Sequence, residues 1–317
     1  MTTLHAELVL QPGSRAGFAR LARDWLTEAR ARLYPELDRV LSGAGPSPPR
    51  TEDDDAPWGP PSGVWARMVV RQQPQAIGGR STLYSQRGWR RTLDGLERGY
   101  PFQVRLEMTP LDPNGQPAGA GPAVLSFQRS QHDPRWARFE AEAAGELAGQ
   151  PETPLAWAGF LRGWAAAAGA HYGHVTDDAT SHGTALERAV LGVTAEPPAI
   201  PRCRDVLRGY SWVTVVAAPL LARLGGAGAL TASGCFTEVS PLPGGRAYLR
   251  ATPALAEYEG PAVRRVFGVL APVLLPGRPD PESVSGSRVR LVLDADAAGG
   301  AGGAGGAGGS DDADGGR

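Results

Sequence analysis

Lysine is absent from this 317-residue chain, and all 32 of its basic residues are arginine. Isoleucine occurs only twice and asparagine only once. Selection for the bidentate contacts of guanidinium groups would raise arginine, but it would not remove isoleucine, so we attribute the bias to a GC-rich bacterial genome. The absence of lysine excludes a P-loop, Schiff-base chemistry on a lysine amine and a protein-kinase ATP site.

The chain also has few cysteines, a net charge close to zero and no long apolar run. Cys203 and Cys235 are too few for a disulfide scaffold. The N-terminus lacks the basic and apolar segments of a signal peptide, and no apolar run reaches the ~18 residues of a membrane span. A net charge of −1 gives no overall attraction to nucleic acid or to anionic membranes. We therefore expect a cytoplasmic protein without a nucleic-acid or membrane partner.

Hydrophobic residues make up 42% of the chain, and its length allows a sizeable core. Strand-like patterns occupy residues 4–10, 64–72, 102–108, 124–128, 136–142, 171–176, 210–216, 235–239, 246–250 and 288–293. Helical spacing occupies residues 14–33, 89–96, 153–168, 187–191, 219–224 and 261–270. These patterns predict an α+β fold, a mixed and largely antiparallel sheet with packed helices.

The composition also predicts the domain organisation. We expect residues 1–295 to form one globular body, with a subdivision near 150–200 as the alternative. Residues 42–63, which are rich in proline and contain an acidic run, predict a mobile loop. Residues 296–317 are mostly Gly-Gly-Ala triplets and predict a disordered tail. The G-x-G-x-x-G matches in that tail lack the strand and helix that a dinucleotide site needs.

Three of the five histidines lie between residues 171 and 182, together with two aspartates. These side chains are suitable ligands for zinc or iron. In a strand, however, His171 and His174 would point to opposite faces of the sheet. We favour a polar loop with hydrogen-bonded histidines, and keep two alternatives: a metal site made of His171, His174 and Asp177, and a metal-free edge that binds a partner.

Cys203 lies between Arg202 and Arg204, which could lower the pKa of its thiol. A nucleophilic cysteine also needs a base, and no sequence pattern places one beside it. The chain contains no G-x-S-x-G, H-E-x-x-H or C-x-x-C motif. We interpret Cys203 as a structural thiol.

Four arginines surround Trp89 on a predicted helix: Arg87, Arg90, Arg91 and Arg98. At helical spacing they lie along one flank. We interpret this flank as a solvated face, with phosphate or partner binding as the alternative.

Residues 209–252 combine an aromatic strand, a helix that ends in Leu-Gly-Gly and a hairpin around Gly244-Gly245. This segment resembles the C-terminal half of a bacterial immunity-protein family associated with type VI secretion and other contact-delivered toxins. The resemblance implies a non-enzymatic cytoplasmic protein, without a cofactor, that binds and blocks a cognate toxin. Exposed aromatics and arginines are enriched at interface hot spots. The candidates near these motifs are Tyr210, Trp212, Arg246, Tyr248 and Arg250, with core packing as the alternative for Tyr210 and Trp212.

Two other functions stay open at this point. One is a metal-assisted hydrolase or related enzyme centred on His171, His174 and Asp177. The other is a scaffold or accessory protein of a bacterial assembly. Binding to a protein partner is the function that the sequence favours.

Overall fold

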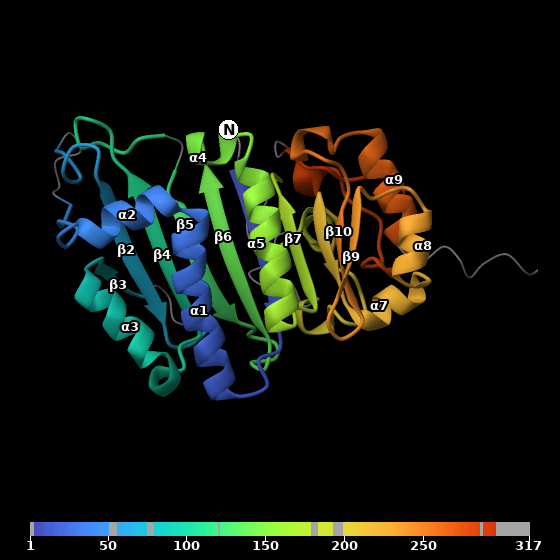
Figure 1. Ribbon diagram of the computed structural model, residues 1–317, viewed down its shortest axis with the longest axis horizontal. Coiled ribbons are helices and arrows are strands. Elements are labelled where there is room, and N and C mark those ends of the chain that lie inside the picture. Colours follow the sequence, from blue (N-terminus) through green and yellow to red (C-terminus); the bar gives the residue numbers. More distant parts are fainter. Residues whose placement is uncertain are drawn as a thin grey trace, which may run out of the picture.

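A computed structural model describes residues 3–50, 56–74, 79–119, 121–178, 183–192, 199–285 and 288–295. One ten-stranded sheet runs through both halves of the chain in the order β3-β2-β4-β5-β6-β1-β7-β8-β10-β9 (Figure 1). Every pairing between neighbouring strands of this sheet is antiparallel. With helices packed against the sheet, the α+β prediction is confirmed, and the sheet is antiparallel rather than mixed.

The strands are short to medium in length, and most lie within two or three residues of the sequence patterns. They are β1 (Thr3–Leu10), β2 (Val64–Arg71), β3 (Arg80–Leu83), β4 (Gln103–Pro110), β5 (Ala123–Arg129), β6 (Ala137–Ala144), β7 (Tyr172–Thr176), β8 (Val213–Val216), β9 (Glu238–Leu242) and β10 (Arg246–Arg250). The sequence patterns did not reveal β3.

The helices are α1 (Arg15–Leu33), α2 (Pro35–Gly43), α3 (Gln86–Gly99), α4 (Glu146–Gly149), α5 (Thr153–Ala168), α6 (Ala185–Leu191), α7 (Ala218–Arg223), α8 (Gly226–Ala232) and α9 (Pro261–Leu270). Helices α1, α2 and α3 lie toward one end of the sheet, α5 lies over its middle, and α7, α8 and α9 lie toward the other end (Figure 1). Ser14 caps α1 as expected, since its hydroxyl accepts the N–H of Gly17 at 3.0 Å. No helix of the described residues is long and apolar enough to cross a membrane.

The predicted strand at residues 288–293 is wrong. This segment is irregular, because side chains take the place of a neighbouring strand. The N–H of Arg290 donates to Asp178 Oδ1 at 2.7 Å, and the N–H of Val292 donates to the Tyr210 hydroxyl at 2.8 Å. Because side chains and not a neighbouring backbone accept these N–H groups, the segment does not form a strand of the sheet.

One face of the sheet is covered by α1 and α5, which lie side by side (Figure 1). Trp25 of α1 fills this layer, with its ring centroid 5.8 Å from Phe139 of β6 and 5.4 Å from Trp164 of α5. Its indole N–H donates to the carbonyl of Ser126 at 3.1 Å. The alternation of β1 and β6 therefore points their apolar side chains toward α1 and α5 and their charged side chains to the opposite face.

The proline-rich segment 42–63 belongs only in part to the described residues. Its Ser47 N–H donates to the carbonyl of Tyr84 at 2.9 Å, and its Trp58 N–H donates to the carbonyl of Gly115 at 2.8 Å. Both flanks of the segment are thus attached to neighbouring loops. The acidic run 53–55 and the predicted tail 296–317 lie outside the described residues.

Candidate functional site

The face of the sheet opposite α1 and α5 carries a buried charge network centred on Glu7 and Arg208. Arg208 binds Glu187 through two parallel hydrogen bonds, Nε to Oε1 at 2.7 Å and Nη2 to Oε2 at 2.8 Å. Its Nη1 donates to Glu7. All three side chains are almost wholly buried. Burial opposes the charge of Arg208, but the Glu187 and Glu7 carboxylates outweigh it and raise the pKa of the guanidinium well above its usual value.

Arg138 of β6 extends the network along the sheet. Its Nε lies 3.2 Å from Glu140 Oε1, and its Nη1 lies 3.8 Å from Glu7 Oε2. Among the residues that the structure describes, neither nitrogen has a hydrogen bond of good geometry, and neither does Glu7 Oε2. The network therefore joins β1 and β6 to α6 and to the loop before β8. It holds together residues that are up to 201 positions apart in the chain.

His174 lies inside this network rather than at a surface. It is 1% exposed, with its Nε2 3.0 Å from His5 Nδ1 and its Nδ1 3.1 Å from the Tyr172 hydroxyl. Burial, together with the charges of His5 and Arg208, lowers the pKa of His174 well below its usual value. Burial also acts to lower the pKa of His5, but Glu140 and the neighbouring carboxylates outweigh it, so that this pKa is raised.

The other two residues of the metal hypothesis lie elsewhere. His171 is half-buried, with its ring 5.2 Å from Trp136, and burial together with nearby arginines lowers its pKa to about 4. Asp177 forms a bidentate pair with Arg290, at 2.5 and 2.8 Å. His171, His174 and Asp177 are not brought together: in the described parts of the chain, no three His, Cys, Asp or Glu side chains are placed to hold a metal ion. His182 lies outside those parts.

The three aromatic candidates for a partner interface are buried in the core. Tyr210 is 3% exposed, Trp212 0% and Tyr248 2%. The indole N–H of Trp212 donates to the carbonyl of Thr252 at 3.0 Å, which ties the strand to the end of the hairpin. These rings present no exposed surface to a partner, in line with the core-packing alternative for Tyr210 and Trp212.

The two arginine candidates are half-buried and brace the hairpin. Arg246 Nε donates to the carbonyl of Pro243 at 2.8 Å. Arg250 pairs with Glu238 at 3.3 Å and donates to the carbonyl of Pro253 at 2.9 Å. Their guanidinium groups are therefore engaged within the fold.

Cys203 is fully buried, and burial raises the pKa of its thiol to about 12. The thiol is therefore protonated at neutral pH. This placement fits a structural thiol better than a nucleophile.

The four arginines of α3 lie around a shallow hollow of about 610 Å³, together with Gln86 and Asp94. We call Arg87, Arg90, Arg91 and Arg98 the arginine face, and all four are exposed. Arg90 approaches the Gln86 side-chain oxygen at 3.5 Å. The side chains of the other three form no hydrogen bond or ion pair with any described residue.

Helix α1 lies beside α3 and supports it (Figure 1). Arg15 donates to the backbone carbonyl of Glu97 at 2.6 Å, and Arg23 donates to that of Leu93 at 3.2 Å. The arginines of α1 at this boundary thus bind backbone oxygens and do not neutralise carboxylates of α3. Together α1 and α3 contain nine arginines and four carboxylates, so this end of the molecule is basic although the whole chain is not.

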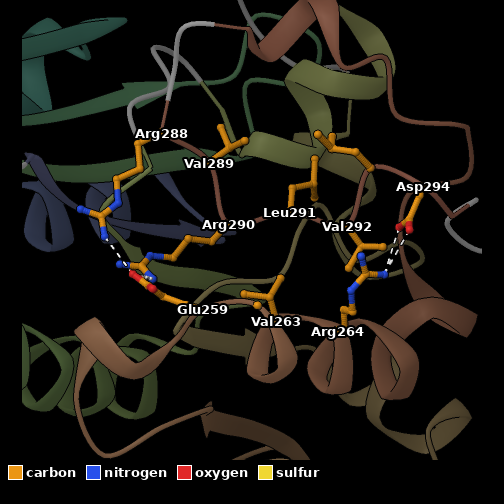
Figure 2. A pocket seen from close by; sticks show the side chains of 11 residues that line it. Glu259, Val263, Arg264, Arg288, Val289, Arg290, Leu291, Val292 and Asp294 are labelled. Atoms are coloured by element: carbon orange, nitrogen blue, oxygen red, sulfur yellow. Dashed lines mark hydrogen bonds and ion pairs between the residues drawn. The ribbon is translucent and has the colours of Figure 1, made fainter.

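A second hollow, of about 530 Å³, lies between α9 and the irregular segment 288–294 (Figure 2). Ion pairs close both of its ends: Glu259 with Arg288 at 3.3 Å, and Arg264 with Asp294 at 3.2 Å. Its charged groups are thus already paired, unlike those of the arginine face.

No protein-family model and no curated protein matches this sequence. Among solved structures, the chain is similar to the Pseudomonas aeruginosa T6SS protein PA0821, with 15% sequence identity and a TM-score of 0.49. The similarity covers 92% of this chain and 80% of that one.

Proposed function

We propose that this chain is an interaction protein of the toxin-immunity kind, which binds its protein partner through the arginine face of α3. The observation that carries the proposal is that Arg87, Arg91 and Arg98 are exposed and pair with no described residue. Such guanidinium groups are available for bidentate bonds to carboxylates, which give both affinity and orientation. The resemblance of residues 209–252 to immunity proteins supports the same class of function.

An acidic protein surface fits this face better than nucleic acid does. Asp94 and Glu97 lie between the arginines on α3, so a continuous phosphate backbone would meet carboxylates on the same helix. The aromatic side chain of this helix, Trp89, is buried and offers no ring for base stacking. Separate carboxylates on a protein can pair with the arginines and avoid the two acidic positions.

The test is co-expression with the toxin-like product of a neighbouring reading frame. We expect the wild-type chain to copurify with that product and to protect the cells. The double variant Arg87→Glu/Arg91→Glu should bind about 10- to 100-fold more weakly, because charge reversal replaces attraction by repulsion. The matched control is Arg265→Glu/Arg278→Glu, which changes the charge equally at two exposed arginines outside the arginine face.

Each outcome decides a separate part of the proposal. If the wild-type chain neither copurifies nor protects, the immunity function is wrong. If both double variants protect equally well, the arginine face is not the docking surface. If the wild-type chain binds a 20-base-pair DNA duplex at physiological salt and the α3 variant does not, the face serves nucleic acid instead.

A further inference from the structure

Residues 288–294 cross the body of the protein as an irregular segment that no strand joins (Figure 2). Its backbone groups form no hydrogen bond with another backbone among the residues that the structure describes. Its side chains alternate in burial: Arg290 and Val292 are buried, whereas the residues beside them are half-buried. A peptide bound in a groove has the same features, since alternate side chains enter the groove and their neighbours stay outside.

The groove beneath the segment surrounds Arg290 with acceptors. The guanidinium forms the bidentate pair with Asp177, at 2.5 and 2.8 Å, and donates to the carbonyl of Tyr258. The backbone N–H of the same residue donates to Asp178, which is itself buried. Glu259 lies 3.4 Å from the guanidinium. One arginine of the segment thus meets three carboxylates and a carbonyl, which come from two distant parts of the chain.

Other contacts fix the direction and the register of the segment. The N–H of Val292 donates to the Tyr210 hydroxyl at 2.8 Å, and the side chain of Val292 is 5% exposed. The ion pairs at the two ends of the hollow add to this order, because Arg288 faces an acid of the body and Asp294 faces a base (Figure 2). The charges of the segment and of the groove are therefore complementary along its length.

Most of these contacts are polar, so the segment can leave the groove at a lower cost than unfolding of the sheet. When it leaves, the carboxylates and guanidinium groups regain water, which offsets much of what their bonds contributed. Val292 is the one apolar side chain of residues 288–294 that is buried. The adjoining hollow of about 530 Å³ means that the outer side of the segment is not closely packed. Opening of this kind is local.

We propose that this groove is a binding site for an extended Arg-x-Val segment of a partner protein, and that residues 288–294 occupy it as a built-in competitor. The partner's arginine pairs with Asp177, and its valine lies beside Tyr210. A second copy of this chain is a poorer occupant, because each copy holds its own segment at the high effective concentration of a tethered ligand. The site is separate from the arginine face and does not depend on the function proposed for that face.

The test uses fluorescence anisotropy of a fluorescein-labelled peptide with the sequence of residues 288–295, Arg-Val-Arg-Leu-Val-Leu-Asp-Ala. Binding to the wild-type full chain should be weak, since its own segment lowers the fraction of open sites. Arg290→Glu replaces the pair with Asp177 by repulsion, so it should empty the groove and tighten binding of the peptide at least tenfold. Arg20→Glu makes the same charge change at an exposed arginine of α1 and should bind the peptide as the wild type does.

Two comparisons test whether the groove recognises the arginine. A second peptide, with glutamate in place of the central arginine, should bind the Arg290→Glu chain at least tenfold more weakly than the first peptide. Asp177→Asn, added to Arg290→Glu, should weaken the first peptide by a similar factor, because the arginine of the peptide loses its carboxylate partner.

Circular dichroism checks that each variant is folded. Val292→Ala loosens the segment without a change of charge and should tighten binding of the first peptide about three- to tenfold. This variant decides the question if Arg290→Glu does not fold.

The remaining outcomes overturn the proposal. If no folded variant of the segment binds the first peptide more tightly than the wild type does, the segment is a fixed part of the fold and the groove binds no peptide. Equal binding of the two peptides would show that the arginine is not recognised. A wild-type dimer in light scattering that Arg290→Glu converts to a monomer would assign the groove to a second copy of this chain instead of a partner protein.

Discussion

The guanidinium of Arg208 and the carboxylate of Glu187 face each other through two hydrogen bonds of 2.7 and 2.8 Å, and both side chains are buried. Glu187 also completes a capping box with Thr184 at the start of α6. The pair therefore fixes the start of α6 against the loop before β8, while Glu7 holds the same guanidinium to the centre of the sheet.

Loss of Arg208 should be strongly destabilising. Arg208→Met leaves the carboxylates of Glu7 and Glu187 buried without their main partner, which should lower the free energy of unfolding by about 3–5 kcal/mol. Urea denaturation followed by circular dichroism measures the change. Arg265→Met, at an exposed arginine of α9, is the control and should stay within about 0.5 kcal/mol of wild type. A loss below about 1 kcal/mol for Arg208→Met would contradict the role of the network.

Acid should weaken the fold through His171. Its pKa is about 4 in the folded protein against 6.5 as the ordinary value, so the unfolded chain takes up the proton first as the pH falls. His171 therefore does not reduce the free energy of unfolding above pH 6.5. As the pH falls from 6.5 to 4, the unfolded chain binds the proton more tightly, and the free energy of unfolding should drop by about 1–2 kcal/mol by pH 5. Urea midpoints at pH 7 and pH 5 should differ less in His171→Phe than in wild type. His132→Phe, at an exposed histidine, serves as the comparison, and an equal reduction there would contradict the assignment.

Repulsion between the arginines of the arginine face should lower the free energy of unfolding slightly. Arg87 and Arg91 are four residues apart on α3, and like charges at this spacing destabilise a helix. Arg87→Glu, which places a carboxylate three and four residues before Arg90 and Arg91, should therefore raise the free energy of unfolding by about 0.3–0.5 kcal/mol while it weakens partner binding. Thermal and urea unfolding measure the first effect, and copurification measures the second. A variant that loses both stability and binding would indicate a role in folding rather than in docking.

The two thiols should differ sharply in reactivity. Burial raises the pKa of Cys203 to about 12, whereas Cys235 is half-buried. Ellman's reagent at pH 8 should therefore modify one thiol per native chain and both thiols in denaturant. Cys235→Ser should leave no reactive thiol in the native protein. Rapid modification of that variant would show that Cys203 is accessible.

Local patterns in the sequence predicted most of the elements, because those elements depend on neighbours in the chain. The alternation of Leu4, Ala6, Leu8 and Leu10 predicted β1, and Ser14 predicted the start of α1. Segment 288–293 shows the limit of such patterns. It alternates like a strand, but Asp178 and Tyr210 bind its N–H groups instead of a neighbouring backbone.

The candidate sites depend on which residues the fold brings together in space, and local sequence patterns do not contain that information. The arginines of α3 could be placed on one flank from spacing alone, and the structure confirms that they are exposed together. Nothing near Glu7 in the sequence indicates that it meets Arg208. The N–H of Trp157 has no acceptor among the described residues, and nothing near it in the sequence indicates this.

The position of β1 between β6 and β7 has a consequence for synthesis of the chain. Strand β1 pairs along one edge with residues 137–144 and along the other with residues 172–176, and both partners are made later than β1. Residues 11–136 must therefore be made before either edge of β1 is covered, and residues 11–171 before both edges are covered. Until then β1, rich in leucine, presents an open edge that invites pairing with other chains. Slow or stalled translation before residue 176 is thus the stage at which this protein is most exposed to aggregation.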